Sequence, residues 1–136
     1  MSDEKISQEM AEAEFDRFVE MMDLELDPAD MNDNEKSEML DASKRVKRAI
    51  QRGSLIINDD GEAIYTPQRT ESKNPFHFRE LDGHALLASD KRKESARVSQ
   101  GFTMMGQMCK CSPNFFANLK GVDLKVTQAI FVLLTA

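Results

Sequence analysis

The side chains with the most scope for chemistry are two cysteines and two histidines. Cys109 and Cys111 lie in the triplet CKC. A disulfide across a single intervening residue would be strained, because the two side chains project badly for it. The spacing also differs from the C-x₂₋₄-C and H-x₃₋₅-H pairs of zinc sites, even when His77 and His84 are included. We therefore interpret the cysteines as free thiols in a reducing compartment and expect no metal site.

The sequence also offers no recognisable set of catalytic residues. His77 alternates with Phe76 and Phe78, which is typical of a strand residue facing solvent. The acidic residues crowd polar helix faces and a linker, and none is isolated in the apolar surroundings that raise a carboxyl pKa for acid–base work. The chain contains no glycine-rich phosphate-binding motif. We expect no catalytic residues and no cofactor, and we predict that the protein is not an enzyme.

One stretch has part of a calcium-loop pattern. Asp30, Asn32 and Asn34 match the first, third and fifth positions of such a loop. The sixth position should be glycine and the twelfth a bidentate glutamate, but they are Glu35 and Asp41. The sequence therefore argues against a calcium site.

Charge is distributed unevenly along the 136 residues, whose formal net charge is −6. Residues 1–43 contain 15 acidic and 3 basic residues, whereas residues 44–136 contain 9 acidic and 15 basic residues. This pattern indicates an acidic arm and a mildly basic body, whose charges either neutralise each other or serve partners. Basic clusters at 44–48 and 91–93 suggest a DNA-binding or regulatory factor as an alternative function. The net acidity and the lack of interleaved aromatic residues argue against nucleic acid as a partner.

Apolar side chains are the most distinctive part of the composition. The chain has nine methionines and eight phenylalanines but no tryptophan, and methionine packs adaptably against varied partners. Two apolar groups stand out, one in the N-terminal region and one near the C-terminus. Each can be core or partner-binding surface, and for the C-terminal group we favour intrachain packing. The partner-binding candidates are Phe15, Phe18, Val19, Met22, Phe115, Phe116, Leu119, Ile130, Phe131 and Leu134.

The hydrophobic pattern predicts a mainly α fold of the α+β class, with four to five helices, a small β hairpin and, as an option, one extra short strand. A first helix over 8–24 is stopped by Pro28. A second begins at an N-cap on Asp33 or Asn34 and ends at Gly53 in a left-handed C-cap. Residues 54–66 read as the hairpin and 75–81 as the extra strand.

The C-terminal half is predicted to be helical. Asp82 should cap a helix from about 83 to 108, Ser112 and Pro113 should open a short helix over 114–120, and Asp123 should cap the last helix. We expect that last helix to close the core. The predicted organisation is an acidic helical arm with its linker at 1–32 and a helical body at 33–136. The arm helix can dock on its own body, on another copy or on a client.

Neither end of the sequence carries a recognisable targeting segment. The first ten residues, MSDEKISQEM, lack the basic and apolar regions of a signal peptide. The closing run VTQAIFVLLTA is only about half of the roughly 20 residues that a membrane-spanning helix needs. We therefore expect a cytoplasmic protein with no membrane partner.

The order of segments from 75 to 136 resembles the small tail assembly chaperones of long-tailed bacteriophages. FHFREL runs into DGHALLASDKRK and a helix that becomes apolar, and PNFFANLKGVDLKV then leads into QAIFVLL. GSLIINDDGEAIYTP also resembles a hairpin found ahead of this region in some members of the family. The matching residues are Phe78, Arg79, Glu80, Leu81, Gly83, Leu86, Leu119, Asp123, Val126, Ile130 and Leu134.

The resemblance implies a non-enzymatic function in the host cytoplasm. Proteins of this family bind the long, helical tape-measure protein, keep it soluble during tail assembly and are absent from the mature virion. A Met- and Phe-rich groove suits this task, because promiscuous binders repack around varied helix faces. The resemblance also implies self-association. The alternatives from the residues themselves are a DNA-binding or regulatory factor and a structural tail or connector subunit of the virion.

Overall fold

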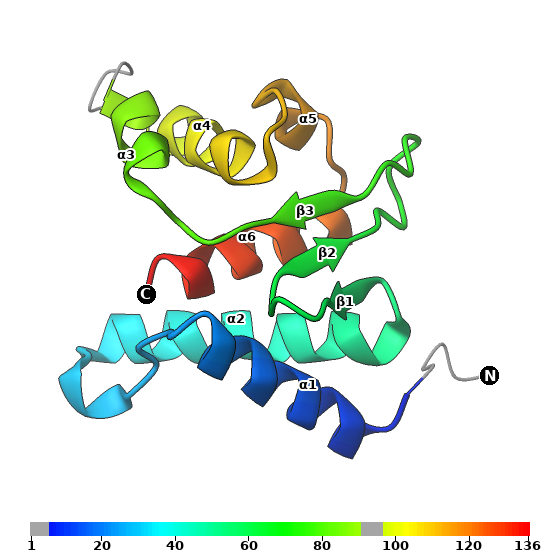
Figure 1. Ribbon diagram of the computed structural model, residues 1–136, viewed down its shortest axis with the longest axis vertical. Coiled ribbons are helices and arrows are strands. Elements are labelled where there is room, and N and C mark those ends of the chain that lie inside the picture. Colours follow the sequence, from blue (N-terminus) through cyan, green and yellow to red (C-terminus); the bar gives the residue numbers. More distant parts are fainter. Residues whose placement is uncertain (1–5, 91–96) are drawn as a thin grey trace.

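The computed structural model describes residues 6–90 and 97–136, which form six α-helices, one 3₁₀ helix and a three-stranded sheet (Figure 1). This confirms the predicted mainly α fold of the α+β class, with the hairpin and the extra strand. In chain order the elements are α1 (Gln8–Met21), η1 (Pro28–Asp30), α2 (Asp33–Arg52), β1 (Leu55–Ile57), β2 (Ala63–Tyr65), β3 (Phe76–Phe78), α3 (Gly83–Asp90), α4 (Arg97–Cys109), α5 (Asn114–Ala117) and α6 (Val122–Leu134).

Helix α1 ends earlier than the sequence predicts, at Met21. Asp23 adopts a left-handed φ of 52°. Its amide donates to the Glu20 carbonyl at 3.2 Å, and the Leu24 amide donates to the Val19 carbonyl at 3.0 Å. This is the Schellman pattern, which satisfies the last helical carbonyls and turns the chain away. The helix therefore stops before the linker, without help from the proline.

Helix α2 begins and ends with side-chain and backbone caps. The predicted N-cap was wrong by one or two residues, because Asn32 occupies that position and its Oδ1 accepts the Glu35 amide at 2.8 Å. The following aspartate is already helical, where its charge still favours the helix N-terminus. Gly53 closes the helix with a left-handed φ of 79°, as predicted.

The sheet has the order β1-β2-β3 and is antiparallel throughout. In its register Leu55 faces Tyr65, and Tyr65 faces Phe76. Strand residues alternate between buried and more exposed positions, so one face of the sheet joins the core. The buried face consists of Leu55, Ile57, Ala63, Tyr65, Phe76 and Phe78.

The single helix predicted from about 83 to 108 is wrong. The chain forms α3 and α4, and these two helices pack against each other, so they cannot be parts of one straight rod (Figure 1). The stretch 89–96, SDKRKESA, is almost entirely polar and lacks an apolar face that a continuous helix could bury. Asp82 does cap α3, because its Oδ1 accepts the amides of His84 and Ala85 at 2.9 and 3.2 Å.

The last helix starts differently from the prediction. Gly121 occupies the N-cap position, and Asp123 lies within the first turn with a fully buried side chain. Asp123 is therefore not the N-cap. Its carboxylate is used by a distant segment of the chain, because five hydrogen bonds from Tyr65 and from residues 68–70 converge on it.

Helix α6 lies at the centre of the molecule, between α2 on one side and the α4–α5 region on the other (Figure 1). One hydrophobic core runs through all of these elements and includes the side chains of α1. Phe116 of α5 fills the space above the sheet, with ring centroids 4.8 Å from Phe76 and 6.2 Å from Phe78. The last helix thus packs in the core, as the sequence predicts.

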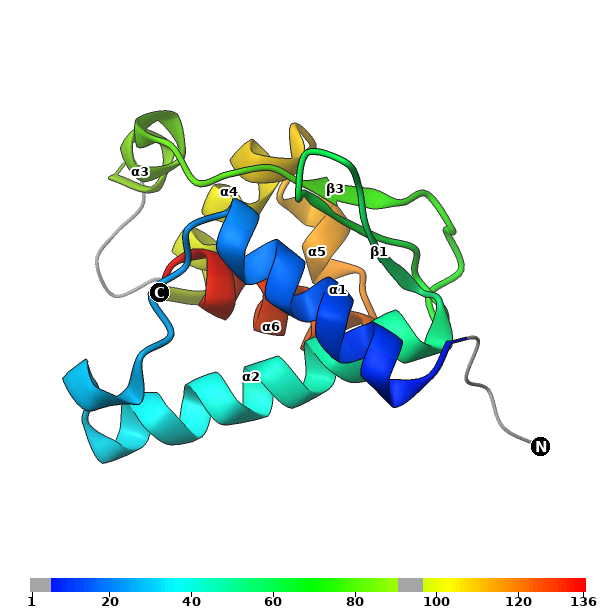
Figure 2. The same cartoon turned by 60° about the horizontal axis from the view of Figure 1, so that its bottom comes forward.

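Helix α1 docks on its own chain, across α2 and beside the hairpin (Figure 2). The guanidinium of Arg17 donates to the carbonyls of Ile57 and Asn58 at 2.7 and 2.8 Å, and it pairs with Glu14 at 2.6 Å. These bonds join the middle of α1 to the end of β1. Of the three docking partners considered for the arm helix, the structure shows the protein's own body.

Candidate partner-binding groove

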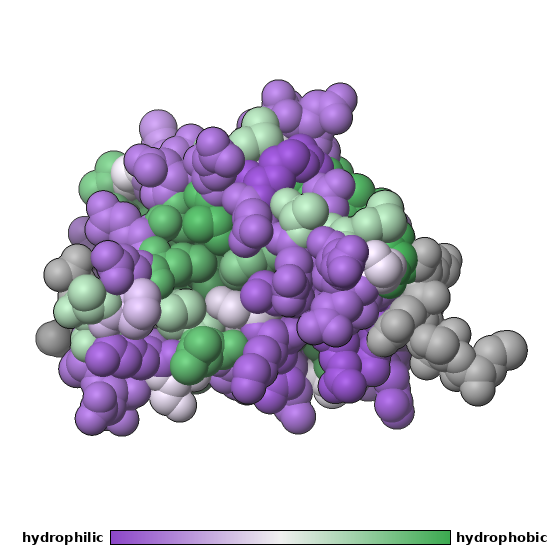
Figure 3. All heavy atoms as spheres, turned by 90° about the horizontal axis from the view of Figure 1, so that it is seen from below, coloured by the Kyte–Doolittle hydropathy of each residue, from purple (hydrophilic) through white to green (hydrophobic). Residues whose placement is uncertain are grey.

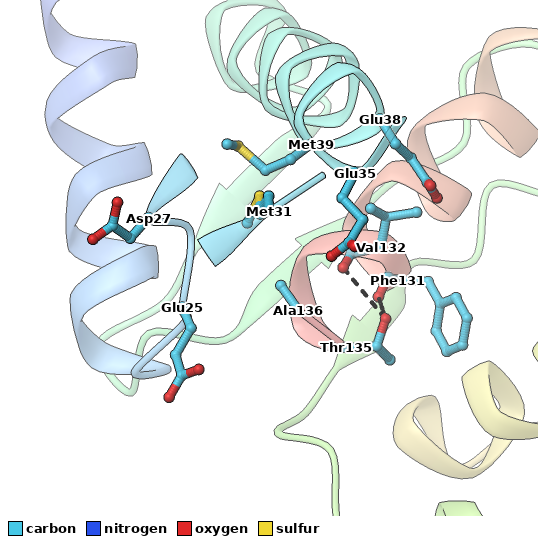
Figure 4. Close-up of a pocket in the computed structure, with 10 residues that line it drawn as sticks. All are labelled: Glu25, Asp27, Met31, Glu35, Glu38, Met39, Phe131, Val132, Thr135 and Ala136. Carbon is cyan, nitrogen blue, oxygen red and sulfur yellow. Dashed lines mark hydrogen bonds between the residues drawn. The ribbon is translucent and has the colours of Figure 1, made fainter. Parts of the chain in front are cut away.

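An open groove of about 450 Å³ lies where the linker after α1, the first half of α2 and the end of α6 meet (Figure 4). Three segments far apart in the sequence come together here, because α2 packs along α6 and the linker returns to the start of α2. The residues that line it are Glu25, Asp27, Met31, Glu35, Glu38, Met39, Phe131, Val132, Thr135 and Ala136.

The groove combines apolar walls with an acidic rim. Its apolar side chains, those of Met31, Met39, Phe131 and Val132, are all half-buried. Its four carboxylates are exposed and belong to Glu25, Asp27, Glu35 and Glu38. Among the described residues, no lysine, arginine or histidine lines the groove. The face of the molecule drawn in Figure 3 carries a hydrophobic patch among hydrophilic residues.

Local hydrogen bonds hold the walls in place. Asp27 Oδ1 accepts the Ala29 amide at 3.0 Å, and the Met31 amide donates to the Pro28 carbonyl at 3.2 Å. These bonds form the 3₁₀ turn that brings Met31 against the start of α2. On the opposite wall the Thr135 hydroxyl donates to the Phe131 carbonyl at 2.8 Å. The groove is therefore largely preformed, which lowers the cost of binding.

This arrangement suits an amphipathic helix with basic flanks. Apolar side chains of such a helix can enter between the methionines, whose unbranched side chains adapt to irregular shapes. Lysine or arginine next to them would meet the carboxylates of the rim, which favours basic partners and disfavours acidic ones. Helix-in-groove binding of this kind needs no chemistry from the protein beyond contact and charge.

The candidates on α1 lie in the core. Phe15, Phe18 and Met22 are buried, and Val19 is half-buried against the core. Lys47 covers the Phe15 ring, with Nζ 4.9 Å from the ring centroid. The helix turns this whole face toward α2 and the hairpin, so these side chains stabilise the fold and are not available to a partner in this conformation.

The C-terminal candidates divide between core and surface. Phe116, Leu119, Ile130 and Leu134 are buried, as expected from intrachain packing. Phe131 is half-buried and lines the groove. Phe115 is 50% exposed and lies at a second, smaller hollow. The structure therefore places one of the ten predicted residues in the groove.

Sequence reasoning missed most of the groove. Met31 and Met39 line the groove, but neither was among the predicted partner-binding residues. The signal that could have found them is the pair of methionines on either side of the α2 N-cap, each surrounded by acidic residues. That signal identifies the side of the groove formed by the linker and α2. The opposite wall comes from α6, about a hundred residues later, and no local pattern predicts this contact.

The two cysteines lie at the smaller hollow, which measures about 220 Å³ and is mostly lined by Pro67, Phe76, Phe115 and Leu119 together with polar loop residues. Both thiols are free, as predicted. Burial raises the pKa of Cys109, and burial also raises the pKa of Cys111. Protonated thiols are poor nucleophiles and poor metal ligands. Within residues 6–90 and 97–136 no cluster of three His, Cys, Asp or Glu side chains could hold a metal ion.

His77 is not simply solvent-facing, in contrast to the prediction. It is half-buried, and its Nε2 lies 2.6 Å from Oε1 of Glu62, the residue just before β2. Glu62 also accepts from the Asn58 amide group at 3.2 Å. Burial acts to raise the pKa of Glu62, but the hydrogen bonds and the nearby positive charges lower it overall. The pair stabilises the outer face of the sheet between β2 and β3.

A broad basic surface covers the second half of α2. It forms a shallow hollow of about 650 Å³ that also contacts α1 and α6. Its cations are Lys44, Arg45, Lys47, Arg48 and Arg52, and its acids are Glu12 and Asp41. Within the part of the chain that the structure describes, no aromatic side chain lines it. The other predicted basic cluster, at 91–93, lies outside the described residues.

The acidic and basic halves of the sequence are scarcely joined by ion pairs. In the described part of the chain the pairs are Glu14–Arg17, Asp41–Arg45, Glu62–His77 and Asp82–His84. Only Asp41–Arg45 links residues 1–43 to the basic remainder, and these two are neighbours on α2. Direct pairing within the chain therefore does not neutralise the charge asymmetry among these residues, and both charged surfaces remain open to partners.

No protein-family model, no curated protein and no solved structure matches this chain. In the residues that the structure describes, none of the helices has the length and apolar character needed to cross a membrane.

Proposed function

We propose that this protein is a non-enzymatic tail assembly chaperone of a long-tailed bacteriophage or prophage. It binds the helical tape-measure protein in the host cytoplasm, keeps it soluble while the tail is built and is not retained in the mature virion. The observation that carries this proposal is the groove with methionine walls and an acidic rim. The resemblance of residues 75–136 to this family supplies the identity of the client.

The groove supports client binding by its shape and charge. Its volume of about 450 Å³ is enough for a short segment of a helical client and would leave the rest to further copies. Contact with methionine side chains places few demands on the client sequence. A long helical client can therefore be covered by many copies that each protect a short apolar segment.

The first test is co-expression with the neighbouring long helical open reading frame, followed by affinity capture and multi-angle light scattering. The proposal predicts a soluble complex that contains many copies per client. Purified virions should contain the client without this protein. A stable presence in virions would favour a structural tail or connector subunit, and absence of any complex would contradict the chaperone function.

Variants of the groove connect binding to this site. Met39→Glu places a charge on the apolar wall, and the double variant Glu35→Lys, Glu38→Lys reverses half of the rim. We expect both to weaken capture of the client by about tenfold or more, because apolar contact and charge are each lost at the same place. The matched control is Glu71→Lys, which reverses an exposed charge in the loop between β2 and β3, outside the groove. Equal capture by the groove variants and the control would exclude the groove as the site.

The basic surface of α2 favours one second candidate, a DNA-binding or regulatory factor. Five cations share this surface, and lysine and arginine neutralise phosphates without requiring base contacts. Against it stand the net charge of −6 and the absence of an aromatic stacking residue from the described lining of the hollow. Binding of duplex DNA that falls steeply with salt, together with no client complex, would support this candidate.

A further inference from the structure

The outward face of α2 is an exposed stripe with a regular order of charge. This outer stripe lies opposite the side of the helix that buries Ala42, Val46, Ala49 and Ile50. All of its side chains are exposed, and Leu40 at its centre is 55% exposed. The outer stripe consists of Asp33, Ser37, Leu40, Asp41, Lys44 and Arg48.

The outer stripe carries its acidic residues in its first half and at its centre, and its basic residues in its second half. Its midpoint lies between Leu40 and Asp41. Asp33 and Arg48 are equally far from that midpoint on opposite sides, and so are Ser37 and Lys44. Asp33, Lys44 and Arg48 form no ion pair with any other described residue. A two-fold symmetric contact brings each position of the outer stripe opposite the position equally far from the midpoint on the other side, so Asp33 of each copy would face Arg48 of the other.

We propose that two copies of this chain associate through the outer stripe, with their α2 helices antiparallel. At 1.5 Å per residue, the antiparallel arrangement places Asp33 of one copy level with Arg48 of the other at both ends. Near the two-fold axis the two Leu40 side chains can then meet, while each Asp41 keeps its ion pair with Arg45 of its own helix. A parallel arrangement would oppose Asp33 to Asp33 and Arg48 to Arg48, which is unfavourable.

A second copy fits this surface better than nucleic acid does. The acidic residues of the outer stripe precede its basic residues along the helix, and Asp33 and Asp41 would repel a phosphate backbone that followed it. The association leaves the groove open, because Glu35, Glu38 and Met39 lie on the side of α2 that faces α6. It therefore does not depend on the proposed function. One helix of 20 residues per copy spans about 30 Å, so the interface is small and the dimer should be weak.

The test is a charge swap, measured by sedimentation velocity over a range of protein concentrations at low and high salt. The wild-type chain should associate as concentration rises and dissociate as salt is added. Asp33→Arg alone and Arg48→Asp alone should each abolish the dimer, because each opposes two like charges at both ends of the contact. The double variant Asp33→Arg, Arg48→Asp should dimerise again, as should an equal mixture of the two single variants.

Restored dimerisation in the double variant would show that the single variants lost the contact and not the fold, because a second substitution would not refold an unfolded single variant. Leu40→Ser gives an independent measurement: it should abolish the dimer and leave the thermal melt unchanged. A wild-type monomer at all concentrations, or a double variant that stays monomeric like the single variants, would overturn the proposal. So would a monomer that binds duplex DNA through Lys44 and Arg48 and loses that binding in the double variant.

Discussion

The hydroxyl of Tyr65 donates a 2.6 Å hydrogen bond to the carboxylate of Asp123, and both side chains are fully buried. The same carboxylate accepts the amides of Gln68, Arg69 and Thr70 at 2.7, 2.8 and 2.7 Å, and the Thr70 hydroxyl at 2.8 Å. Burial, the largest influence, raises the pKa of Asp123, but the hydrogen bonds, led by that of the Gln68 amide, lower it to about 2. One carboxylate thus fixes the end of β2 and the following loop to the start of α6.

Removal of this carboxylate should destabilise the whole protein. Asp123→Ala leaves several buried donors without an acceptor, and we expect it to lower the free energy of unfolding by about 3 kcal/mol or more. Tyr65→Phe removes one donor and leaves the carboxylate with its other partners, so its cost should be smaller, about 2 kcal/mol. Urea unfolding followed by circular dichroism measures both. Equal costs for the two variants would show that the carboxylate does not act as the shared acceptor.

Stability should also depend on acid through this group. The pKa of Asp123 is about 2 in the folded protein, below its ordinary value of 3.8. The stabilisation is therefore fully present above about pH 4 and is lost as the pH falls toward 2. Unfolding free energies measured across this range for the wild-type chain and for Asp123→Asn test the prediction. The wild-type curve should fall more steeply, and parallel curves would assign the acid sensitivity to other carboxyl groups.

Deletion of α6 should abolish the fold. Truncation after Gly121 removes five buried apolar side chains as well as Asp123; the apolar ones are Val126, Ala129, Ile130, Leu133 and Leu134. Loss of this surface exposes the core faces of α2 and α4, so the truncated chain should show no cooperative thermal melt. The control deletes only residues 135–136, which are exposed. A truncated chain that melts like the wild type would make α6 a dispensable segment.

The docking of α1 depends on a close approach at Gly61. A Cβ atom there would lie 2.5 Å from Met21 Cβ, and the residue has a left-handed φ of 80°. Gly61→Ala should therefore destabilise the protein by about 1–3 kcal/mol, from overpacking and backbone strain together. It should also increase proteolysis within α1. Gly83→Ala is the matched control, because nothing lies within 4 Å of a Cβ at that position. Equal stability of the two variants would mean that α1 shifts freely on the hairpin.

Local sequence patterns predicted the elements with clear periodicity or a distinctive end residue. The α2 helix, its C-cap at Gly53, the hairpin around 58–61 and the cap at Asp82 all depend on short-range rules, which act within one or two turns of the chain. The amphipathic faces of α1 and α6 were recognised as apolar for the same reason. Whether such a face packs in the protein's own core or against a partner depends on the tertiary arrangement. The periodicity of the sequence does not predict that arrangement.

The groove and the role of Asp123 were missed because both depend on contacts between distant segments. An aspartate near the start of a helix is most simply read as an N-cap. Here the donors come from residues 65–70, which only the folded chain brings to α6. Similarly, the wall formed by Phe131 and Val132 reaches the linker methionine only after α2 has packed on α6.

The Tyr65–Asp123 contact spans 58 residues of sequence, and the other bonds to that carboxylate span 53 to 55. During synthesis, the loop after β2 is made before Asp123, the residue whose carboxylate accepts its hydrogen bonds. The earlier elements can collapse, but their native packing cannot be completed until α6 has been made, because this helix also completes the core beside α2. The groove can therefore form only after α6 has been synthesised, because Phe131 and Val132 supply one of its walls.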